Sequence, residues 1–335
     1  MEYRTLGNSD LRVSVISQGS WAIGGPWAHG WGEVDDQESI RTIRKSIDAG
    51  INFIDSANVY GLGHAEEIIG EAIQGRRDKV FLATKFGAIP NANAPGGFNW
   101  DGSPAHMAQE CEKSLMRLKT DHLDLLQVHW PIAETPIADT MGGFQRLIQQ
   151  GKLRYAGVCN FSKAQLAEAM KYGKLVSLQL RYNLLERDME EEVIPFCIAN
   201  GMGVQVYGPL AHGLLAGEFK HGDKLKAEDW RSRYTLYESA MFEKIMCVLD
   251  KLLPIAKSHN HTLADLAINW ILNRAGVTTA LIGMIHPWQV DENLRSIDFQ
   301  LSQKDLGEID RAIKEADIEL RILAPEAYME KTKQK

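Results

Sequence analysis

The chain has 335 residues, of which 44% are hydrophobic and 24% charged, and its formal net charge is −7. These values are typical of a globular protein with a large core and exclude a disordered or collagen-like chain. The acidic balance argues against nucleic-acid binding, which normally needs a basic face. No apolar run is long enough to cross a membrane, and the charged first residues, with no apolar segment among them, predict that the chain has no secretory signal. We therefore expect a cytoplasmic protein.

Short apolar runs alternate with amphipathic stretches along the chain. Their nearly continuous apolar character is typical of parallel strands that are buried on both faces. The runs that we predict as β-strands are Val13–Gly19, Asn52–Asp55, Val80–Lys85, Leu123–His129, Arg154–Val158, Val176–Leu180, Gly203–Tyr207 and Thr279–Ile282.

Helical stretches lie between and after these runs. In Asp36–Ala49, isoleucines recur on one stripe, and Ser103-Pro104 has the order of a cap followed by proline at the first helical position. Ser162 and Gln165 have capping-box spacing. The further predicted helices are Ser103–Leu118, Ile137–Gln150, Ser162–Lys171, Met189–Asn200, Glu238–Ser258, Leu263–Arg274, Pro287–Ser296 and an appended C-terminal helix, Ser302–Glu315.

Eight strands that alternate with helices predict an α/β fold, a (β/α)8 TIM barrel. Residues Arg4–Val15, with Gly7-Asn8 at the turn, predict an N-terminal β-hairpin at the bottom of the barrel. The charged segment Leu214–Ser239 is predicted as a long loop over the active face. No linker or change of composition divides the chain, which predicts one domain over residues 1–335.

The four cysteines are Cys111, Cys159, Cys197 and Cys247. They form no CxxC pair and have no zinc-ligand spacing with histidine. We therefore expect buried thiols in a reducing compartment and no metal site.

Four ionisable residues follow the ends of neighbouring predicted strands. Asp55, Lys85 and His129 each end an apolar run, and Tyr60 lies in the loop just after Asp55. In a barrel these strand ends point to the C-terminal face, where barrel enzymes keep their active sites. We therefore expect the four side chains to meet in one mouth.

These residue types suit acid–base chemistry. A tyrosine has an unperturbed pKa near 10, and a nearby ammonium stabilises the phenolate and lowers that value. We expect Lys85 to tune Tyr60 as a general acid. Asp55 would hold Lys85 charged, and His129 would bond the substrate carbonyl oxygen. Each residue alone also has a structural interpretation, but a buried lysine is costly unless it is paired.

Six segments, in order along the chain, resemble motifs of the aldo-keto reductase superfamily. Asp229–Arg233 (DWRSR) is also similar to the bacterial branch of inositol-associated and general-stress reductases. The six segments are FIDSANVYG (Phe53–Gly61), LATKFG (Leu82–Gly87), LLQVHW (Leu125–Trp130), GVCNFS (Gly157–Ser162), VYGPLAHGLLAG (Val206–Gly217) and GMIHPWQVDENL (Gly283–Leu294).

The resemblance implies an oxidoreductase that interconverts an aldehyde or ketone with an alcohol by hydride transfer. It implies a nicotinamide cofactor and a catalytic set of Asp55, Tyr60, Lys85 and His129. The implied cofactor contacts are Asn160 and Gln179 at the carboxamide, Tyr207 stacked on the nicotinamide ring, Gly208, Leu210 and Gly213 at the pyrophosphate, Gly19 and Trp21 near the ribose, and Gly283, Met284, Gln289, Glu292 and Asn293 around the adenosine end.

The sequence departs from the family pattern at several positions. Cys159 stands where the family usually has serine, and a thiol is a weaker hydrogen-bond partner. Many NADP-preferring members carry lysine or arginine where this chain has Gly283, Ile285 or Gln289. A 2′-phosphate binds best to those cations. The family favours NADP(H), whereas these positions leave NAD(H) open.

Tryptophans are concentrated in the predicted loops on the active side. Trp27, Trp31 and Trp130 are predicted to contact the substrate, because aromatic side chains stack on sugars or ring compounds. Packing of the loops is the alternative interpretation. The partner is then a small-molecule carbonyl or alcohol, with a sugar or polyol derivative among the candidates. The physiological substrate, the direction of reaction and the oligomeric state stay open.

Two other functions fit a barrel of this kind. One is a non-catalytic subunit that binds the cofactor as a sensor and regulates a partner such as an ion channel. The other is a lyase or isomerase in which Lys85 forms a Schiff base. Tyr60 and Asn160 would have no role in the second.

Overall fold

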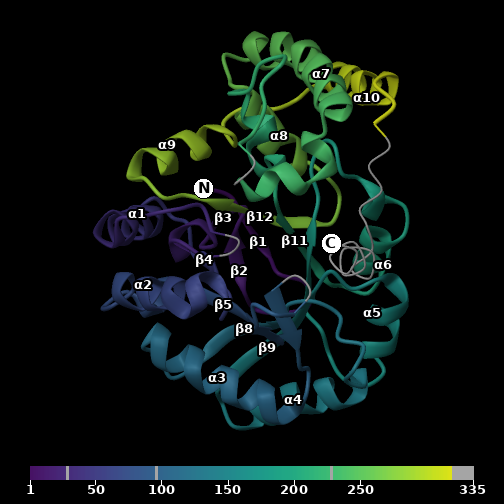
Figure 1. Ribbon diagram of the computed structural model, residues 1–335. Coiled ribbons are helices and arrows are strands. Elements are labelled where there is room, and N and C mark those ends of the chain that lie inside the picture. Colours follow the sequence, from purple (N-terminus) through teal and green to yellow (C-terminus); the bar gives the residue numbers. More distant parts are fainter. Residues whose placement is uncertain (28–29, 95–96, 227–228, 319–335) are drawn as a thin grey trace.

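The computed structural model describes residues 1–27, 30–94, 97–226 and 229–318. Eight parallel strands close into a barrel in the same order as they occur along the chain (Figure 1). The predicted (β/α)8 barrel is therefore confirmed. Its strands are β3 (Ile16–Gly19), β4 (Phe53–Asp55), β5 (Phe81–Phe86), β8 (Leu123–Val128), β9 (Leu153–Cys159), β10 (Ser177–Arg181), β11 (Gly203–Tyr207) and β12 (Val277–Gly283).

Helices surround these strands (Figure 1). The helix α10 (Gln303–Glu315), predicted as an appended helix, packs against α7 (Ser239–Ser258). The other α-helices of the described residues are α1 (Asp36–Asp48), α2 (His64–Ala72), α3 (Pro104–Leu118), α4 (Ile137–Gln149), α5 (Lys163–Ala169), α6 (Val193–Ala199), α8 (Leu263–Leu272) and α9 (Pro287–Arg295).

Side-chain caps explain why most of these helices begin where the sequence predicts. Ser103 accepts from the backbone N–H of His106, with proline next in the chain. The capping box of Ser162 and Gln165 is complete. Helix α2 was not predicted, because it begins after Gly63, whose φ is +103° and which offers no side-chain cap. The predicted helix at Met189–Asn200 is shorter, since α6 begins only at Val193.

The N-terminal hairpin closes the bottom of the barrel. Strands β1 (Tyr3–Thr5) and β2 (Arg12–Ser14) are antiparallel, so residues 13–14 belong to the hairpin and not to the first barrel strand. Leu6 and Leu11 are fully buried and pack with Phe53 inside the barrel. Gly7 has a φ of +53°, and a Cβ there would lie 2.1 Å from the carbonyl oxygen of Val176. Only glycine fits this turn.

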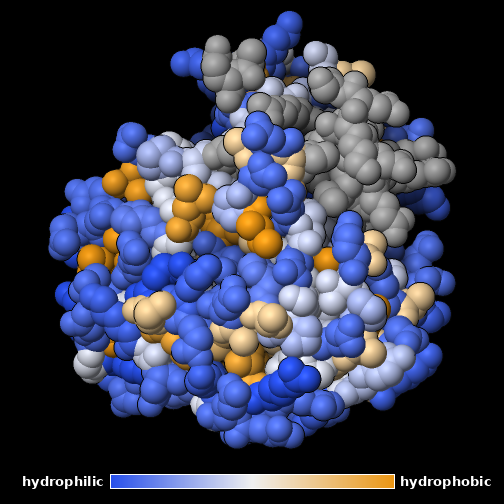
Figure 2. All heavy atoms as spheres, turned by 60° about the horizontal axis from the view of Figure 1, so that its bottom comes forward, coloured by the Kyte–Doolittle hydropathy of each residue, from blue (hydrophilic) through white to orange (hydrophobic). Residues whose placement is uncertain are grey.

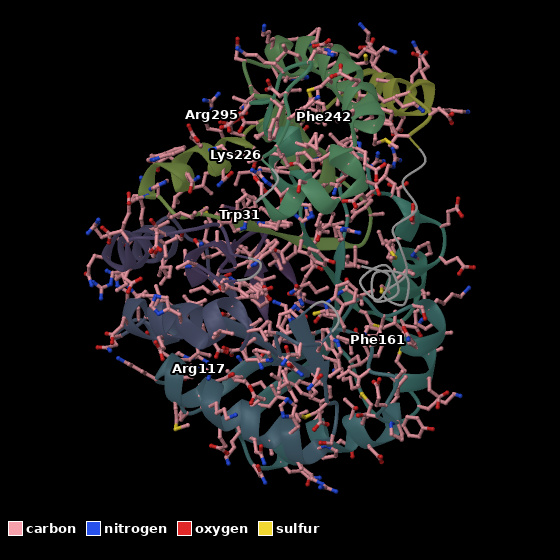
Figure 3. The ribbon with its side chains drawn as sticks, in the orientation of Figure 1. Trp31, Arg117, Phe161, Lys226, Phe242 and Arg295 are labelled. Atoms are coloured by element: carbon pink, nitrogen blue, oxygen red, sulfur yellow. The ribbon has the colours of Figure 1, made fainter. Side chains whose placement is uncertain are left out.

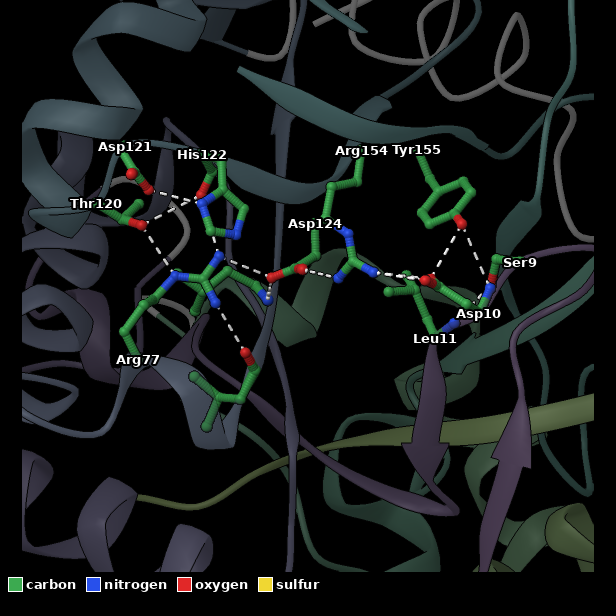
Figure 4. A network of polar contacts seen from close by, with 12 residues as sticks. Ser9, Asp10, Leu11, Arg77, Thr120, Asp121, His122, Asp124, Arg154 and Tyr155 are labelled. Carbon is green, nitrogen blue, oxygen red and sulfur yellow. Dashed lines mark hydrogen bonds and ion pairs between the residues drawn. The ribbon is translucent and has the colours of Figure 1, made fainter. Parts of the chain in front are cut away.

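A polar network ties the hairpin turn to two barrel strands (Figure 4). Asp124 on β8 is 1% exposed and accepts from Arg77 at 2.8 Å and from Arg154 at 2.5 Å. Arg154 on β9 also bonds both carboxylate oxygens of Asp10, at 2.8 and 2.9 Å. Tyr155 donates to Asp10 as well. The network lies at the end of the barrel opposite the strand ends that carry Asp55 and Lys85.

A second hairpin, not predicted, follows β5. It consists of β6 (Ala88–Pro90) and β7 (Phe98–Trp100). It places Phe98 and Trp100 beside the loop that contains Val59 and Tyr60. Aromatic residues of the hairpin therefore form part of the wall of the barrel mouth.

The face of the molecule in Figure 2 is mostly polar. Its apolar side chains lie in small separate groups. None of the helices in the described ranges is long and apolar enough to span a bilayer. Cys111, Cys159 and Cys197 are buried, but Cys247 on α7 is exposed, so the expectation that all four thiols are buried is wrong.

Candidate active site

Asp55 and Lys85 form a buried ion pair at the C-terminal ends of two adjacent strands. Strands β4 and β5 pair in parallel, with Asp55 opposite Ala83 and Lys85 two residues further along. Lys85 Nζ lies 2.6 Å from Asp55 Oδ2, and the two side chains are 0% and 4% exposed. A side chain in a strand reappears on the same face every second residue, which explains why both point into the mouth.

The ammonium of Lys85 is satisfied by three oxygen atoms. Besides Asp55 it donates to the carbonyl oxygen of Ser56 at 2.7 Å and to Tyr60 Oη at 3.2 Å. An ammonium has only donors to offer, so the phenol oxygen of Tyr60 accepts this bond. The hydrogen of the Tyr60 hydroxyl is then free to be donated to another acceptor.

The backbone around Tyr60 fixes its position. Tyr60 begins the short 3-10 helix η2 (Tyr60–Gly63), and Gly61 has a φ of +58°. A Cβ on Gly61 would lie 1.9 Å from the carbonyl oxygen of Gly24, so the loop after β3 packs directly on this glycine. The close approach of two backbones therefore holds the tyrosine against Lys85.

The electrostatics of Tyr60 differ from the sequence prediction. Burial raises the pKa of Tyr60 to about 12, and the charge of Lys85 offsets only part of that rise. The lysine acts in the expected direction, but the predicted net lowering is wrong because desolvation of the phenolate outweighs it. Burial disfavours the charge of Lys85 as well, yet the charge of Asp55 raises the pKa of Lys85 above its ordinary value.

His129 lies next to Tyr60. It directly follows β8, and the two ring centroids are 6.0 Å apart in an edge-to-face arrangement. Burial and the charge of Lys85 hold the pKa of His129 well below 6.5, so its ring is neutral at neutral pH. Its buried Nδ1 has no hydrogen-bond partner among the described residues. A neutral imidazole with an unused nitrogen suits a bond to a substrate oxygen.

The residues predicted at the carboxamide lie next to this set. Asn160, at the end of β9, has a φ of +61° and donates to the carbonyl oxygen of His129 at 3.2 Å. Tyr207 donates to Asn160 Oδ1 at 3.0 Å. Gln179 Nε2 donates to Asp55 Oδ1 at 2.8 Å, a contact that the sequence did not indicate. Burial raises the pKa of Cys159, whose thiol therefore stays protonated beside Lys85.

Two arginines lie along the glycine segment that follows β11. Residues 208 and 211–213 all have positive φ. A Cβ on Gly208 would lie 3.6 Å from Arg181 Cγ, and one on Gly213 would lie 3.4 Å from Arg231 Nη1. Burial and the charges of both arginines lower the pKa of His212, in the same segment, to about 3.

The backbone of this segment suits a phosphate group, and each nearby guanidinium also has a carboxylate partner: Arg231 pairs with Asp229 at 2.7 Å and Arg181 with Glu186 at 3.0 Å. Open glycine backbone permits close approach, and guanidinium groups bind phosphate oxygens with charge-assisted bonds. The sequence reasoning did not assign a phosphate role to Arg181 or Arg231. Arg181 could have been found, because it stands two residues after Gln179 and so faces the same side of β10. Half-buried Leu210 lies between the two glycines.

The residues predicted around the ribose and adenosine meet where β12 pairs with β3. Gly283 is the register partner of Gly19, and a Cβ on Gly283 would lie 3.8 Å from Ala22 Cβ, next to Trp21. Met284 is buried and accepts from Gln18 through its carbonyl oxygen.

Helix α9 supplies the other predicted residues of this end. The side-chain oxygen of Gln289 accepts from the backbone of Ile285 at 2.7 Å and of His286 at 3.0 Å. Gln289 therefore braces the loop before α9, and only its amide hydrogens are left for a ligand. Glu292 is exposed and Asn293 half-buried on the same helix.

The three tryptophans predicted at the substrate do not share one place. Trp27 lies beside Tyr60, with ring centroids 6.5 Å apart, and half-buried Trp130 follows His129. Trp31 instead contacts Trp21 at 6.0 Å and Trp230 at 5.4 Å. It lies where the loop after β3 meets the segment before α7 (Figure 3).

Trp230, near the end of the predicted loop Leu214–Ser239, contacts the loop after β3. The predicted loop contains the short 3-10 helices η7 (Trp230–Arg233) and η8 (Thr235–Tyr237), while its first residues belong to η6 (Ala211–Ala216). Trp230 packs on Trp21 with ring centroids 5.1 Å apart.

Comparison with known proteins identifies the family of this chain. The Aldo/keto reductase family matches residues 15–314. The chain belongs to the aldo/keto reductase family. The resemblance predicted from the motifs is thereby confirmed, and this aldo/keto reductase is an oxidoreductase of a family that uses nicotinamide cofactors and small carbonyl compounds.

Bacterial proteins are among its relatives. The reductase is 35% identical to the aldo-keto reductase YhdN of Bacillus subtilis over 317 residues, and the matched region covers 94% of each chain. It is 34% identical to the NADH-specific methylglyoxal reductase of Escherichia coli, over 90% of this chain and 94% of that one. The glycerol dehydrogenase AKR11B4 from Gluconobacter oxydans has a similar structure, with a TM-score of 0.87, 32% identity and coverage of 96% and 97%.

Proposed function

We propose that this reductase interconverts an aldehyde or ketone with an alcohol by hydride transfer, with Tyr60 as the general acid and base. The observation that carries the proposal is the bond from Lys85 Nζ to Tyr60 Oη at 3.2 Å. It turns the hydroxyl hydrogen of Tyr60 away from the lysine. It also places a positive charge where the phenolate forms after proton transfer.

The described residues fit a nicotinamide cofactor. The carbonyl oxygen of Gln179 and the amide of Asn160 suit a carboxamide group, and Tyr207 offers an aromatic face beside them. The glycine segment from Gly208 to Gly213, with Arg181 and Arg231 along it, suits the pyrophosphate. When bound, the cofactor supplies or accepts the hydride.

The protein then handles the proton and the substrate oxygen. In reduction, Tyr60 Oη gives its hydrogen to the developing alkoxide, and Lys85 stabilises the phenolate that results. His129, neutral at neutral pH, bonds the same oxygen and orients the carbonyl. Asp55 keeps the positive charge on Lys85 throughout. In oxidation, the Tyr60 phenolate takes the proton of the alcohol.

The adenosine end favours NAD(H) over the NADP(H) that the family resemblance suggests. The loop from Gly283 to His286 contains neither lysine nor arginine. Glu38, at the start of α1, bonds His286 at 3.0 Å and adds a carboxylate to this edge. A 2′-phosphate next to a carboxylate is repelled, whereas a ribose hydroxyl is not. The NADH-specific relative in Escherichia coli supports this choice.

The substrate that we propose is a small oxygenated carbonyl compound or the matching polyol. Methylglyoxal and glycerol, in the names of two similar proteins, are both three-carbon compounds of this kind. Trp27 beside Tyr60 supplies an apolar wall. A Schiff base on Lys85 is disfavoured, because its nitrogen is held as an ammonium by three acceptors and cannot act as a nucleophile.

The decisive test is oxidation of NADH and NADPH with a reactive aromatic aldehyde and with three-carbon carbonyl compounds. We expect turnover in the wild type and a loss of about 10²–10⁴-fold in kcat for Tyr60→Phe, with cofactor affinity unchanged. Tyr172→Phe, which removes an exposed hydroxyl bonded to Glu168, is the control. Tight cofactor binding without turnover in either direction would instead support the non-catalytic sensor.

A further inference from the structure

Three glutamines fill the interior of the barrel below the catalytic ion pair. Gln127 on β8, Gln179 on β10 and Gln205 on β11 are 0%, 3% and 0% exposed. The interior of such a barrel is usually packed with branched apolar side chains, and Leu125 is an example here. A buried amide that finds no partner destabilises the fold, so these amides need an explanation.

The glutamines form one network that ends on Asp55. Gln179 Nε2 donates to Asp55 Oδ1 at 2.8 Å, and Gln127 Nε2 approaches the same oxygen at 3.5 Å. Gln205 Nε2 donates to Gln127 Oε1 at 3.0 Å and to Ser177 Oγ at 2.9 Å. Gln205 Oε1 in turn lies 3.5 Å from Gln179 Nε2.

The charge of Asp55 sets the direction of every amide in this network. An ionised carboxylate only accepts hydrogen bonds, so Gln179 and Gln127 must both turn their NH2 groups toward it. The oxygen of Gln127 then needs a donor, which Gln205 supplies. A network with a single possible direction holds its members more rigidly than independent side chains.

We propose that Gln127 and Gln205 are positioning residues for the reaction: they hold the Asp55 carboxylate ionised beside Lys85 and fix the orientation of the Gln179 amide. The inference rests on the proposed function, since Asp55 matters to turnover only through Lys85 and Tyr60. Burial raises the pKa of Asp55, and the charge of Lys85 and the bonds from Lys85, Gln179 and Gln127 oppose that rise. The donors therefore sustain the charged form of a carboxylate that burial disfavours.

Other titratable groups near the pair are neutral at neutral pH. They are Tyr60, His129, Cys159 and Tyr207, which come from four different segments. Burial raises the pKa of both tyrosines and of the thiol, and burial with the charge of Lys85 lowers the pKa of His129. Because these four groups carry no charge at neutral pH, the charge of Asp55 is stabilised by Lys85 and by the amide donors of Gln179 and Gln127.

The test replaces each amide by a side chain of similar volume that cannot donate, Gln127→Met and Gln205→Met. The protonation of Asp55 is followed directly by carbon NMR of protein labelled at the aspartate carboxyls, with Asp55→Asn to assign the signal. We expect the titration of Asp55 to move to higher pH in Gln127→Met, and by a smaller amount in Gln205→Met, because Gln205 does not bond Asp55 directly. On the acidic side of the kcat profile, the pH at which kcat falls to half should rise by the same amount.

Thr279→Val is the matched control. Thr279 Oγ1 bonds Ser17 Oγ at 2.5 Å inside the same barrel and does not bond a glutamine. The Thr279→Val variant should leave the pH at which Asp55 titrates unchanged. Folded Met variants that titrate like the wild type would overturn the proposal and show that the glutamines only fill the barrel.

Two further results keep the test decisive. If the Met variants do not fold, Gln205→Asn, which shortens the reach to Gln127 and stays polar, must still shift the Asp55 titration, or the proposal fails. A wild type without turnover would refute the proposed function and leave the NMR test of the network intact.

Discussion

His286 Nδ1 lies 3.0 Å from Glu38 Oε1, so a carboxylate from the start of α1 is bound to the loop that joins β12 to α9. The Thr42 hydroxyl on α1 also donates to the carbonyl oxygen of Ile285 at 2.7 Å, which holds the same loop. The two residues of the pair are 248 positions apart in the sequence, yet they meet at one edge of the proposed adenosine end.

Removal of this carboxylate should change cofactor selection. We expect Glu38→Gln to strengthen NADPH binding about fivefold relative to NADH, because an exposed charge interaction is worth up to about 1 kcal/mol. Gln289→Arg would supply a phosphate ligand, but it also removes the side-chain oxygen that accepts from Ile285 and His286, so Glu38→Gln is the cleaner test. Dissociation constants are measured from cofactor fluorescence at low and high salt. Glu243→Gln, on the distant helix α7, is the control, and an equal change in both cofactors would contradict the assignment.

The high pKa of Tyr60 predicts different pH profiles for the two directions. Reduction needs the protonated phenol, and Tyr60 keeps its proton until the pH approaches 12. The kcat for reduction should therefore stay level from about pH 6 to about pH 10. Oxidation needs the phenolate, so its kcat should rise with pH by up to about tenfold per unit.

His129 should add no break near neutral pH, because its pKa lies well below 6.5. The pH profiles of kcat for reduction and for oxidation are both measured with saturating cofactor and substrate. A reduction rate that falls above neutral pH would show that the bound cofactor lowers the pKa of Tyr60 far below its value in the free protein.

The stability of the barrel bottom should depend on Asp124. Asp124→Asn leaves two guanidinium groups without their shared buried carboxylate, and we expect a loss of about 3 kcal/mol in the free energy of unfolding. Asp10→Asn removes an exposed partner of the same Arg154 and should lose about 1 kcal/mol or less. Urea unfolding measures both. The kcat of each variant should equal that of the wild type, since the network lies at the opposite end of the barrel from Tyr60.

The candidate catalytic set could be predicted from the sequence because Asp55, Lys85 and His129 each end an apolar run and Tyr60 follows Asp55 in the next loop. Parallel strands all end on one face of a barrel, which brings these residues together. The direct bond from Gln179 to Asp55 could not be predicted, since it depends on how these two side chains meet inside the closed barrel. Likewise, the direction of the pKa shift of Tyr60 depends on how deeply the side chain is buried, and the order of motifs in the sequence does not reveal that.

Local signals account for the elements that were missed. Helix α2 lacks a polar cap, and the β6–β7 hairpin is too short for an alternating pattern to stand out. The pair of Glu38 and His286 has no signal at all in one sequence, because only the contact of α1 with α9 brings it together.

Gly61 should control the placement of Tyr60. A Cβ on Gly61 would lie 1.9 Å from the carbonyl oxygen of Gly24, so Gly61→Ala must push the two loops apart. We expect kcat to fall by about a hundredfold, because small displacements of a catalytic group have effects of that size.

Gly75→Ala separates this displacement from backbone strain, since Gly75 has a φ of +70° but nothing within 4 Å of its added Cβ. Gly75→Ala should lose only about 1 kcal/mol of stability and keep the wild-type kcat. Equal losses of kcat in the two variants would mean that the contact with Gly24 does not position the tyrosine.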